Sequence, residues 1–261
     1  IGHYAMDKLA QARDYCVRMH NLIQEYLASW TSETWRAEAL IEYANPHFEG
    51  FREVDPKTIY KRLEIVEEGL SILNANSFPD KENLATRASG YSVKGHLIER
   101  LNTFMTSAKK ENVFEAMEAF KKSIELYEML YNMNKTWENR RNLGLAYSSM
   151  GILLSHSPGA GFTSEDAKGW YEKAIPLQET NYQEIHLPTT QEDLAYAYGN
   201  YGMELDDPEE MKLYRDKAVA LLRANYEETK DEHILQNIRD YEASYDRLLN
   251  KNNTKGLFGW L

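Results

Sequence analysis

The stretch NLGLAYSSMG at residues 142–151 returns, little changed, as DLAYAYGNYG at residues 193–202. Leucine, alanine, tyrosine and glycine keep their places in the two copies, which are 51 positions apart, and a weaker copy, RASGYSVKG, covers residues 87–95. Small residues let two helices approach closely, and a tyrosine one turn later fills the groove between them. The recurrence is therefore better explained by a repeated packing contact than by a reused active site.

A second motif follows each copy of the first, at residues 115–126 (EAMEAFKKSIEL), 166–177 (DAKGWYEKAIPL) and 210–221 (EMKLYRDKAVAL). A helix pair thus repeats about three times between residues 81 and 228. A period of this length is typical of solenoids, in which each pair buries its apolar stripe on its neighbours. We predict a right-handed superhelix of antiparallel helix pairs.

Helical periodicity extends over most of the chain, with apolar residues at i, i+3, i+4 and i+7 between prolines that separate the segments. Only Pro176 falls inside such a segment, and Thr163 with Asp166 forms a plausible helix start. No stretch shows the alternation of a strand, so the fold class is all-α. The predicted helices are 3–29, 32–45, 56–75, 81–107, 111–132, 135–154, 164–182, 189–205, 208–228 and 231–250.

The composition of the 261 residues is globular, with 43% hydrophobic and 27% charged residues and a net charge of −11. The negative charge argues against nucleic acid or an anionic membrane surface as partner. No run reaches the roughly 18–20 apolar residues of a membrane span. The single cysteine, Cys16, suits a reducing compartment and is expected to be a buried small side chain. These features predict a cytoplasmic protein.

The repeat resembles the tetratricopeptide repeat (TPR), whose first helix carries Leu-Gly-x2-Tyr and whose second carries Ala-x3-Phe-x2-Ala. The period near 50 is similar to the long variant of kinesin-light-chain-like and bacterial signalling proteins. Met211 and Arg215 depart from the second-helix pattern. The matching residues are Leu143, Gly144 and Tyr147 in one helix and Ala167, Tyr171 and Ala174 in the next.

The resemblance divides the chain into three parts. Residues 1–80 form N-terminal helices, a degenerate repeat or cap, and residues 81–250 form three TPR-like helix pairs plus a capping helix. Residues 251–261 form a polar linker and an apolar tail, in which two glycines argue against a continuing helix. We expect the tail to fold back and cap the last helix, although it could also enter a neighbouring molecule or begin a further segment.

The sequence gives little support for catalysis or for a bound cofactor. The glycine-rich stretch at residues 155–166 lacks the spacing of a phosphate-binding loop and is expected to be a turn between helices. The seven histidines form no metal-ligand spacing, and one cysteine cannot build a zinc site. We therefore expect no cofactor, no metal and no catalytic residue.

The resemblance implies a non-enzymatic domain that binds a protein or peptide on its concave face, within a larger bacterial signalling or regulatory protein. Two alternatives remain open at this point: a regulator domain that senses a peptide or ligand, and an α-helical enzyme. The sequence leaves the oligomeric state open. The residues expected to contact the peptide are Glu138, Arg141, Leu145, Ser148, Ser149, Glu192, Tyr196 and Asn200.

Overall fold

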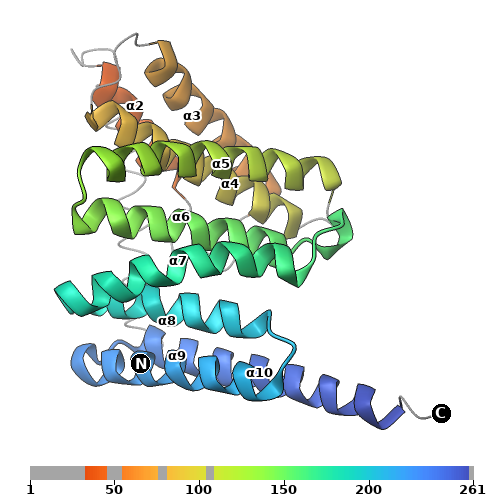
Figure 1. The fold of residues 1–261 in the computed structure, drawn as a ribbon. Coiled ribbons are helices and arrows are strands. Elements are labelled where there is room, and N and C mark those ends of the chain that lie inside the picture. The colour runs from red at the N-terminus through yellow and green to blue at the C-terminus, as the bar shows by residue number, and fades with distance from the viewer. Residues whose placement is uncertain (1–32, 46–54, 76–80, 104–108, 259–261) are drawn as a thin grey trace, which may run out of the picture. The chain divides into compact units, whose positions relative to one another are not determined.

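The computed structural model describes residues 33–45, 55–75, 81–103 and 109–258, and these residues contain helices and no strand (Figure 1). The predicted helix at 3–29 and the environment of Cys16 lie outside the described residues. The elements are α2 (Glu33–Ala44), α3 (Pro56–Ala75), α4 (Lys81–Thr103), α5 (Lys110–Met133), α6 (Trp137–Ser155), the 3-10 turn η3 (Pro158–Ala160), α7 (Ser164–Ile185), α8 (Pro188–Met203), α9 (Pro208–Thr229) and α10 (Glu232–Phe258).

The chain divides into two compact units, residues 1–130 and 131–261, which we call unit 1 and unit 2. This division places the pair α4–α5 in unit 1, except for the last residues of α5, and the pairs α6–α7 and α8–α9 in unit 2. The predicted boundaries at residues 80 and 250 follow the sequence repeats and stay predictions.

Unit 1 is built from antiparallel neighbours. Arg36 of α2 pairs with Glu68 of α3 at 2.5 Å, and Lys94 of α4 pairs with Glu67 of α3 at 2.9 Å. The apolar core beneath these pairs contains Ile41, Val66, Leu73 and Leu97, all buried. The predicted helices at 32–45 and 56–75 are thus confirmed, and their apolar stripes form one core.

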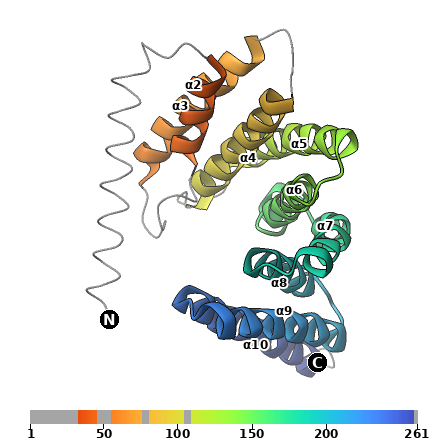
Figure 2. The ribbon, with the colours of Figure 1, turned by 90° about the vertical axis from the view of Figure 1, so that its left-hand side faces the viewer.

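Unit 2 is a stack in which each helix packs against the next one along the chain (Figure 2). Helices α6 and α7 are antiparallel. Gly151, late in α6, lies against Tyr171, early in α7, whereas Arg140, early in α6, bonds to Asn181, late in α7. Helices two positions apart, such as α6 and α8, touch only lightly. This pattern is that of a helical repeat rather than a closed bundle, and the right-handed superhelix stays a prediction.

In two of the three repeated pairs, a glycine of the first helix packs directly against an aromatic ring of the second helix. A methyl group added at Gly95 would come within 2.6 Å of the Phe120 ring, and one added at Gly151 would come within 2.7 Å of the Tyr171 ring. The glycines are required because the rings occupy the space that a Cβ would take. The expected structural role of Gly151 is thereby confirmed.

A tyrosine under a lysine recurs in all three repeated pairs. Lys122 lies 5.2 Å from the Tyr91 ring centroid, Lys173 lies 5.8 Å from that of Tyr147, and Lys217 lies 5.1 Å from that of Tyr198. Each lysine is on the second helix of the pair and each tyrosine is on the first. The repeated tyrosine therefore serves a cation–π contact as well as packing.

Tyr147, the tyrosine expected to fill the groove between two helices, is not a core residue. Its ring is only half-buried and lies against Trp170, with 5.9 Å between centroids, and under Lys173. The fully buried aromatic of this pair is Tyr171, which is 1% exposed. Both rings recur in the sequence, and recurrence alone does not show which one faces the core.

Most helix ends lie within three residues of the predicted ones; the predicted end of α4 at residue 107 lies outside the described residues, and the C-terminus differs more. Thr163 and Asp166 form the capping box that starts α7, and Pro176 lies inside this helix as expected. The predicted end of the last helix at residue 250 is wrong, because α10 continues to Phe258. Residues 250–255 are compatible with a helix, and one glycine costs only about 1 kcal/mol there. The proposed contacts of the tail lie outside the described side chains.

Tyr245 of α10 should make the stability of unit 2 sensitive to alkaline pH. The side chain is buried and its hydroxyl donates to the Gly199 carbonyl at 2.7 Å. Burial raises the pKa of Tyr245, and the charge of Arg215 opposes this rise. The folded state therefore holds the proton more tightly than the unfolded state, so the stabilisation is complete below about pH 10 and is lost as the pH rises further.

The test compares the wild type with Tyr245→Phe in urea denaturation at a series of pH values. At neutral pH the free energy of unfolding of the variant should be about 1 kcal/mol lower than that of the wild type, because the buried hydrogen bond is missing. Above about pH 10 the difference in free energy of unfolding between the two proteins should narrow, since only the wild type must keep this phenol protonated. A gap that stays constant up to about pH 11 would contradict the assignment.

Candidate functional site

The candidate site is the side of unit 2 formed by its first helices, α6, α8 and α10, which we call the first-helix face. On α8 the half-buried residues Glu192, Tyr196 and Asn200 recur every fourth position, whereas Leu194 and Tyr198 between them are buried. The stripe therefore points away from the partner helix α9. The face comprises Glu138, Arg141 and Leu145 of α6, Glu192, Tyr196 and Asn200 of α8, and Asn237, Asp240 and Ser244 of α10.

Two of the predicted contact residues, Ser148 and Ser149, are buried and therefore not presented on this face. Each is 8% exposed. The Ser149 hydroxyl donates to the Leu145 carbonyl at 3.0 Å, and the Ser148 hydroxyl accepts from Gln178 of α7 at 3.5 Å. Hydroxyl groups in a helix commonly turn back to the backbone in this way. The other six predicted residues are exposed or half-buried.

Arg141 joins α6 to α8. Its Nε and Nη2 donate to the two carboxylate oxygens of Asp193, at 2.5 and 3.2 Å. Burial raises the pKa of Asp193, and the bond from Arg141 acts in the opposite direction. The guanidinium is therefore held by a carboxylate of its own chain, which positions the two first helices side by side.

Tyr196 joins α8 to α10 in a similar way. Its hydroxyl donates to Glu192 Oε1 at 2.6 Å and accepts from Asn237 Nδ2 at 2.5 Å, while its ring lies 6.1 Å from that of Tyr241. Burial is the main cause that raises the pKa of Tyr196, and the bond to Glu192 adds to it. Sequence reasoning missed Asn237 because it lies on the capping helix, where the repeat motif is absent.

Carboxylates predominate among the charges of the first-helix face, and the exposed Arg247, which donates to Ser244 at 3.2 Å, adds a cation at its α10 edge. Helix α8 contains no lysine or arginine, and the Arg141 charge is balanced by Asp193. Glu138 and Asp240 are exposed. Gln236 donates to Asp240 at 2.9 Å, an interaction that leaves the carboxylate charge in place. The face therefore presents carboxylates beside a tyrosine ring and amide side chains.

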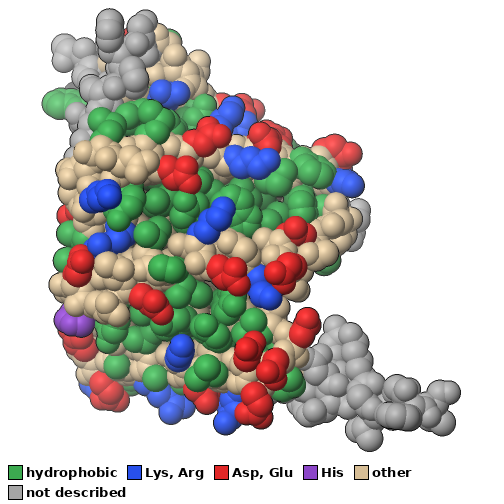
Figure 3. Space-filling view, in the orientation of Figure 1, with side chains coloured by type: hydrophobic (Ala, Val, Ile, Leu, Met, Phe, Trp, Pro, Cys, Tyr) green, Lys and Arg blue, Asp and Glu red, His purple; other side chains and the backbone are tan. Residues whose placement is uncertain are grey.

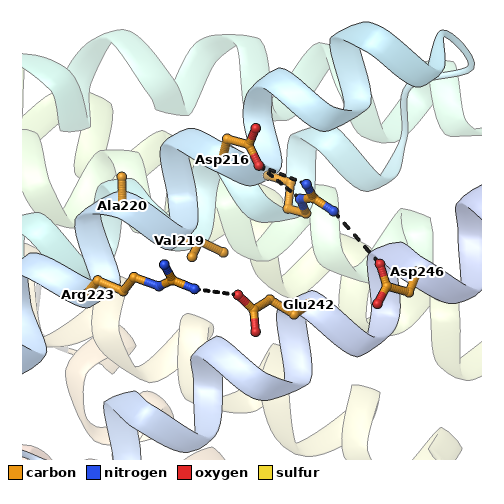
Figure 4. Close-up of a pocket in the computed structure, with 7 residues that line it drawn as sticks. Asp216, Val219, Ala220, Arg223, Glu242 and Asp246 are labelled. Carbon is orange, nitrogen blue, oxygen red and sulfur yellow. Dashed lines mark hydrogen bonds and ion pairs between the residues drawn. The ribbon is translucent and has the colours of Figure 1, made fainter.

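A groove of about 520 Å³ lies between α9 and α10 (Figure 4). Arg223 pairs with Glu242 at 2.8 Å, and Arg215 pairs with Asp246 at 3.8 Å. The charged groups of this groove therefore satisfy one another and hold α10 to α9. Its lining residues are Arg215, Asp216, Val219, Ala220, Arg223, Glu242 and Asp246.

A second groove, of about 380 Å³, lies between α7, α8 and α9 on the side of the second helices. Figure 3 shows hydrophobic side chains gathered over these helices, with acidic and basic groups around them. The Tyr198 hydroxyl donates to Glu179 within this groove, and Lys217 covers the Tyr198 ring. Its lining residues are Glu179, Tyr182, Gln183, Leu194, Tyr198, Lys217, Ala220 and Leu221.

Within the described residues, no helix is long and apolar enough to cross a membrane. In the same part, no three histidine, cysteine, aspartate or glutamate side chains gather in a way that could hold a metal ion.

The comparisons with known proteins concern only the fold. No protein-family model matches the sequence, and no curated protein matches it. A crystal structure of the de novo designed helical repeat protein DHR64 shares 12% identity with a TM-score of 0.31, over 95% of this chain and 97% of that chain. The DHF58 filament shares 14% identity with a TM-score of 0.32, over 91% and 98%. Likenesses at this level carry no information on function.

Proposed function

We propose that the chain is a non-enzymatic recognition module of the TPR type, which binds a protein or peptide segment on the first-helix face of unit 2. The observation that carries the proposal is a contrast between two sets of positions. The tyrosine–lysine contacts recur from pair to pair, whereas the face carries Arg141 and Leu145 in one repeat and Glu192 and Tyr196 in the next. Shared packing with differing outward side chains is what a recognition surface requires.

The chemistry of the face suits a peptide main chain. Asn200 offers both a donor and acceptors at a half-buried position, and Leu145 offers apolar area on the neighbouring helix. The ionisable groups in the groove between α9 and α10 pair with one another, which supports a non-enzymatic role there. The TPR resemblance supports a cytoplasmic setting within a larger bacterial signalling or regulatory protein.

The test begins with peptides selected from a random phage-displayed library against the whole chain. Their affinity is then measured by fluorescence anisotropy for the wild type and two variants that introduce the same bulky side chain. Asn200→Arg alters the first-helix face, and Ala220→Arg, at an exposed position of α9, is the matched control.

We expect Asn200→Arg to weaken binding by about tenfold or more, and Ala220→Arg to leave it unchanged. Circular dichroism melts should show that both variants fold. Binding that survives Asn200→Arg and is lost in Ala220→Arg would place the site on the second helices and overturn the proposal.

A further inference from the structure

The distribution of charge on the first-helix face indicates which class of peptide would bind there. The stripe on α8 has a carboxylate, Glu192, and no cation anywhere on that helix. Arg141 on α6 is already neutralised by Asp193 through two hydrogen bonds. With Glu138 and Asp240 exposed on the neighbouring first helices, carboxylates outnumber the exposed Arg247 beside Ser244, so the net charge of this face is negative.

The negative potential is felt by the side chains around Glu192. Burial is the first cause of the raised pKa of Asp193, Tyr196 and Tyr241, and the charge of Glu192 raises each of the three further. These groups belong to α8 and α10, so the field of this carboxylate extends across two first helices. A low-dielectric surface with one sign of charge attracts the opposite charge on a partner.

Tyr196 supplies a second element of recognition beside this carboxylate. Its ring is half-buried, and its hydroxyl is fixed between Glu192 and Asn237. A ring and a carboxylate side by side suit a lysine or arginine, which gains both a cation–π contact and an ion pair. The chain uses the same chemistry internally, since Lys173 lies 4.1 Å from the centroid of the Trp170 ring.

We infer that the occupant of the first-helix face is an extended peptide segment rich in lysine or arginine, an inference that rests on the proposed function. Its cations lie against Glu138, Glu192 and Asp240, one carboxylate on each first helix, and one of them stacks on Tyr196. Acidic segments are repelled by the same groups. Asn200 can bind the peptide backbone, while the Asn237 amide nitrogen stays on the Tyr196 hydroxyl.

The test uses three fluorescein-labelled synthetic pools of peptides about twelve residues long, which differ only in carrying lysine and arginine, serine and glutamine, or aspartate and glutamate at alternate positions. Binding to the whole chain is measured by anisotropy at physiological salt. We expect the basic pool to bind about tenfold more tightly than the neutral pool. The triple variant Glu138→Gln, Glu192→Gln, Asp240→Asn should reduce its affinity to that of the neutral pool.

The matched control is the triple variant Glu165→Gln, Glu210→Gln, Glu228→Gln, which removes three exposed charges from α7 and α9. The basic pool should bind this control as it binds the wild type. An equal loss in both triple variants would show attraction to the net charge alone and would overturn the inference.

Two further outcomes separate this inference from the proposed function. If the neutral or acidic pool binds best and Asn200→Arg abolishes that binding, the first-helix face is a peptide site and only its assigned chemistry is wrong. If the basic pool binds no better than the others and the peptides selected by display ignore Asn200→Arg, both proposals fail.

Discussion

Replacing Tyr171 with alanine is expected to lower the free energy of unfolding by about 3–5 kcal/mol. The side chain is 1% exposed and its ring packs on Gly151 of the neighbouring helix. Truncation removes a buried aromatic and leaves a cavity that surrounding helices fill only in part. The measurement is urea denaturation followed by circular dichroism.

Tyr147→Ala is the control for this prediction, because Tyr147 recurs as Tyr198 and Tyr171 corresponds to Phe120, but in this pair only Tyr171 is fully buried. Tyr147 is half-buried and would lose its contacts with Trp170 and Lys173. We expect Tyr147→Ala to lower the free energy of unfolding by about 1–2 kcal/mol. Equal costs for the two variants would show that the recurring Tyr147 contributes as much to the core as Tyr171 does.

Replacing Gly151 with leucine is expected to lower the free energy of unfolding by about 3 kcal/mol, the upper range for overpacking. Even the Cβ atom would lie 2.7 Å from the Tyr171 ring, so the ring or the helix must shift. In the Tyr171→Ala background the same leucine should be far less harmful, since it would fill the vacated space.

Gly169→Leu is the matched control, because Gly169 is exposed in the second turn of α7 and a Cβ there would meet nothing within 4 Å. It should stabilise the protein by about 0.5–1 kcal/mol, the usual gain when glycine is replaced in a helix. If Gly151→Leu proved as well tolerated as this control, the close glycine–ring contact would not exist in solution.

The local features of the fold could be predicted from the sequence. The bounds of α3 agree with the prediction at both ends, and the capping box of Thr163 and Asp166 forms as expected. The sequence does not predict the full length of α10, because the glycine at 256 is a weak stop signal whose cost a long helix tolerates. The three lysine–tyrosine contacts were not predicted, although the sequence holds a sign of them. Lys122 and Lys173 are 51 positions apart, which is the spacing of the repeat.

The candidate site was predicted only in part. Glu138, Arg141, Leu145, Glu192, Tyr196 and Asn200 share the first-helix face, because the helical period alone determines which positions point away from the partner helix. The helical period does not determine whether these side chains already bind other helices of the chain. Arg141 is engaged by Asp193, 52 positions away, and Tyr196 by Asn237, 41 positions away.

The sequence by itself determined the helical repeat, its small residues and the stripe of each helix that points outward, because these depend on spacing along one chain segment. Only the tertiary structure decided that Tyr171 rather than Tyr147 is in the core, that Ser148 is buried against α7, and that the Arg141 charge is cancelled while that of Glu192 is not. Burial and charge balance depend on which side chains of other helices come within a few ångströms. Such distances arise only when the helices pack.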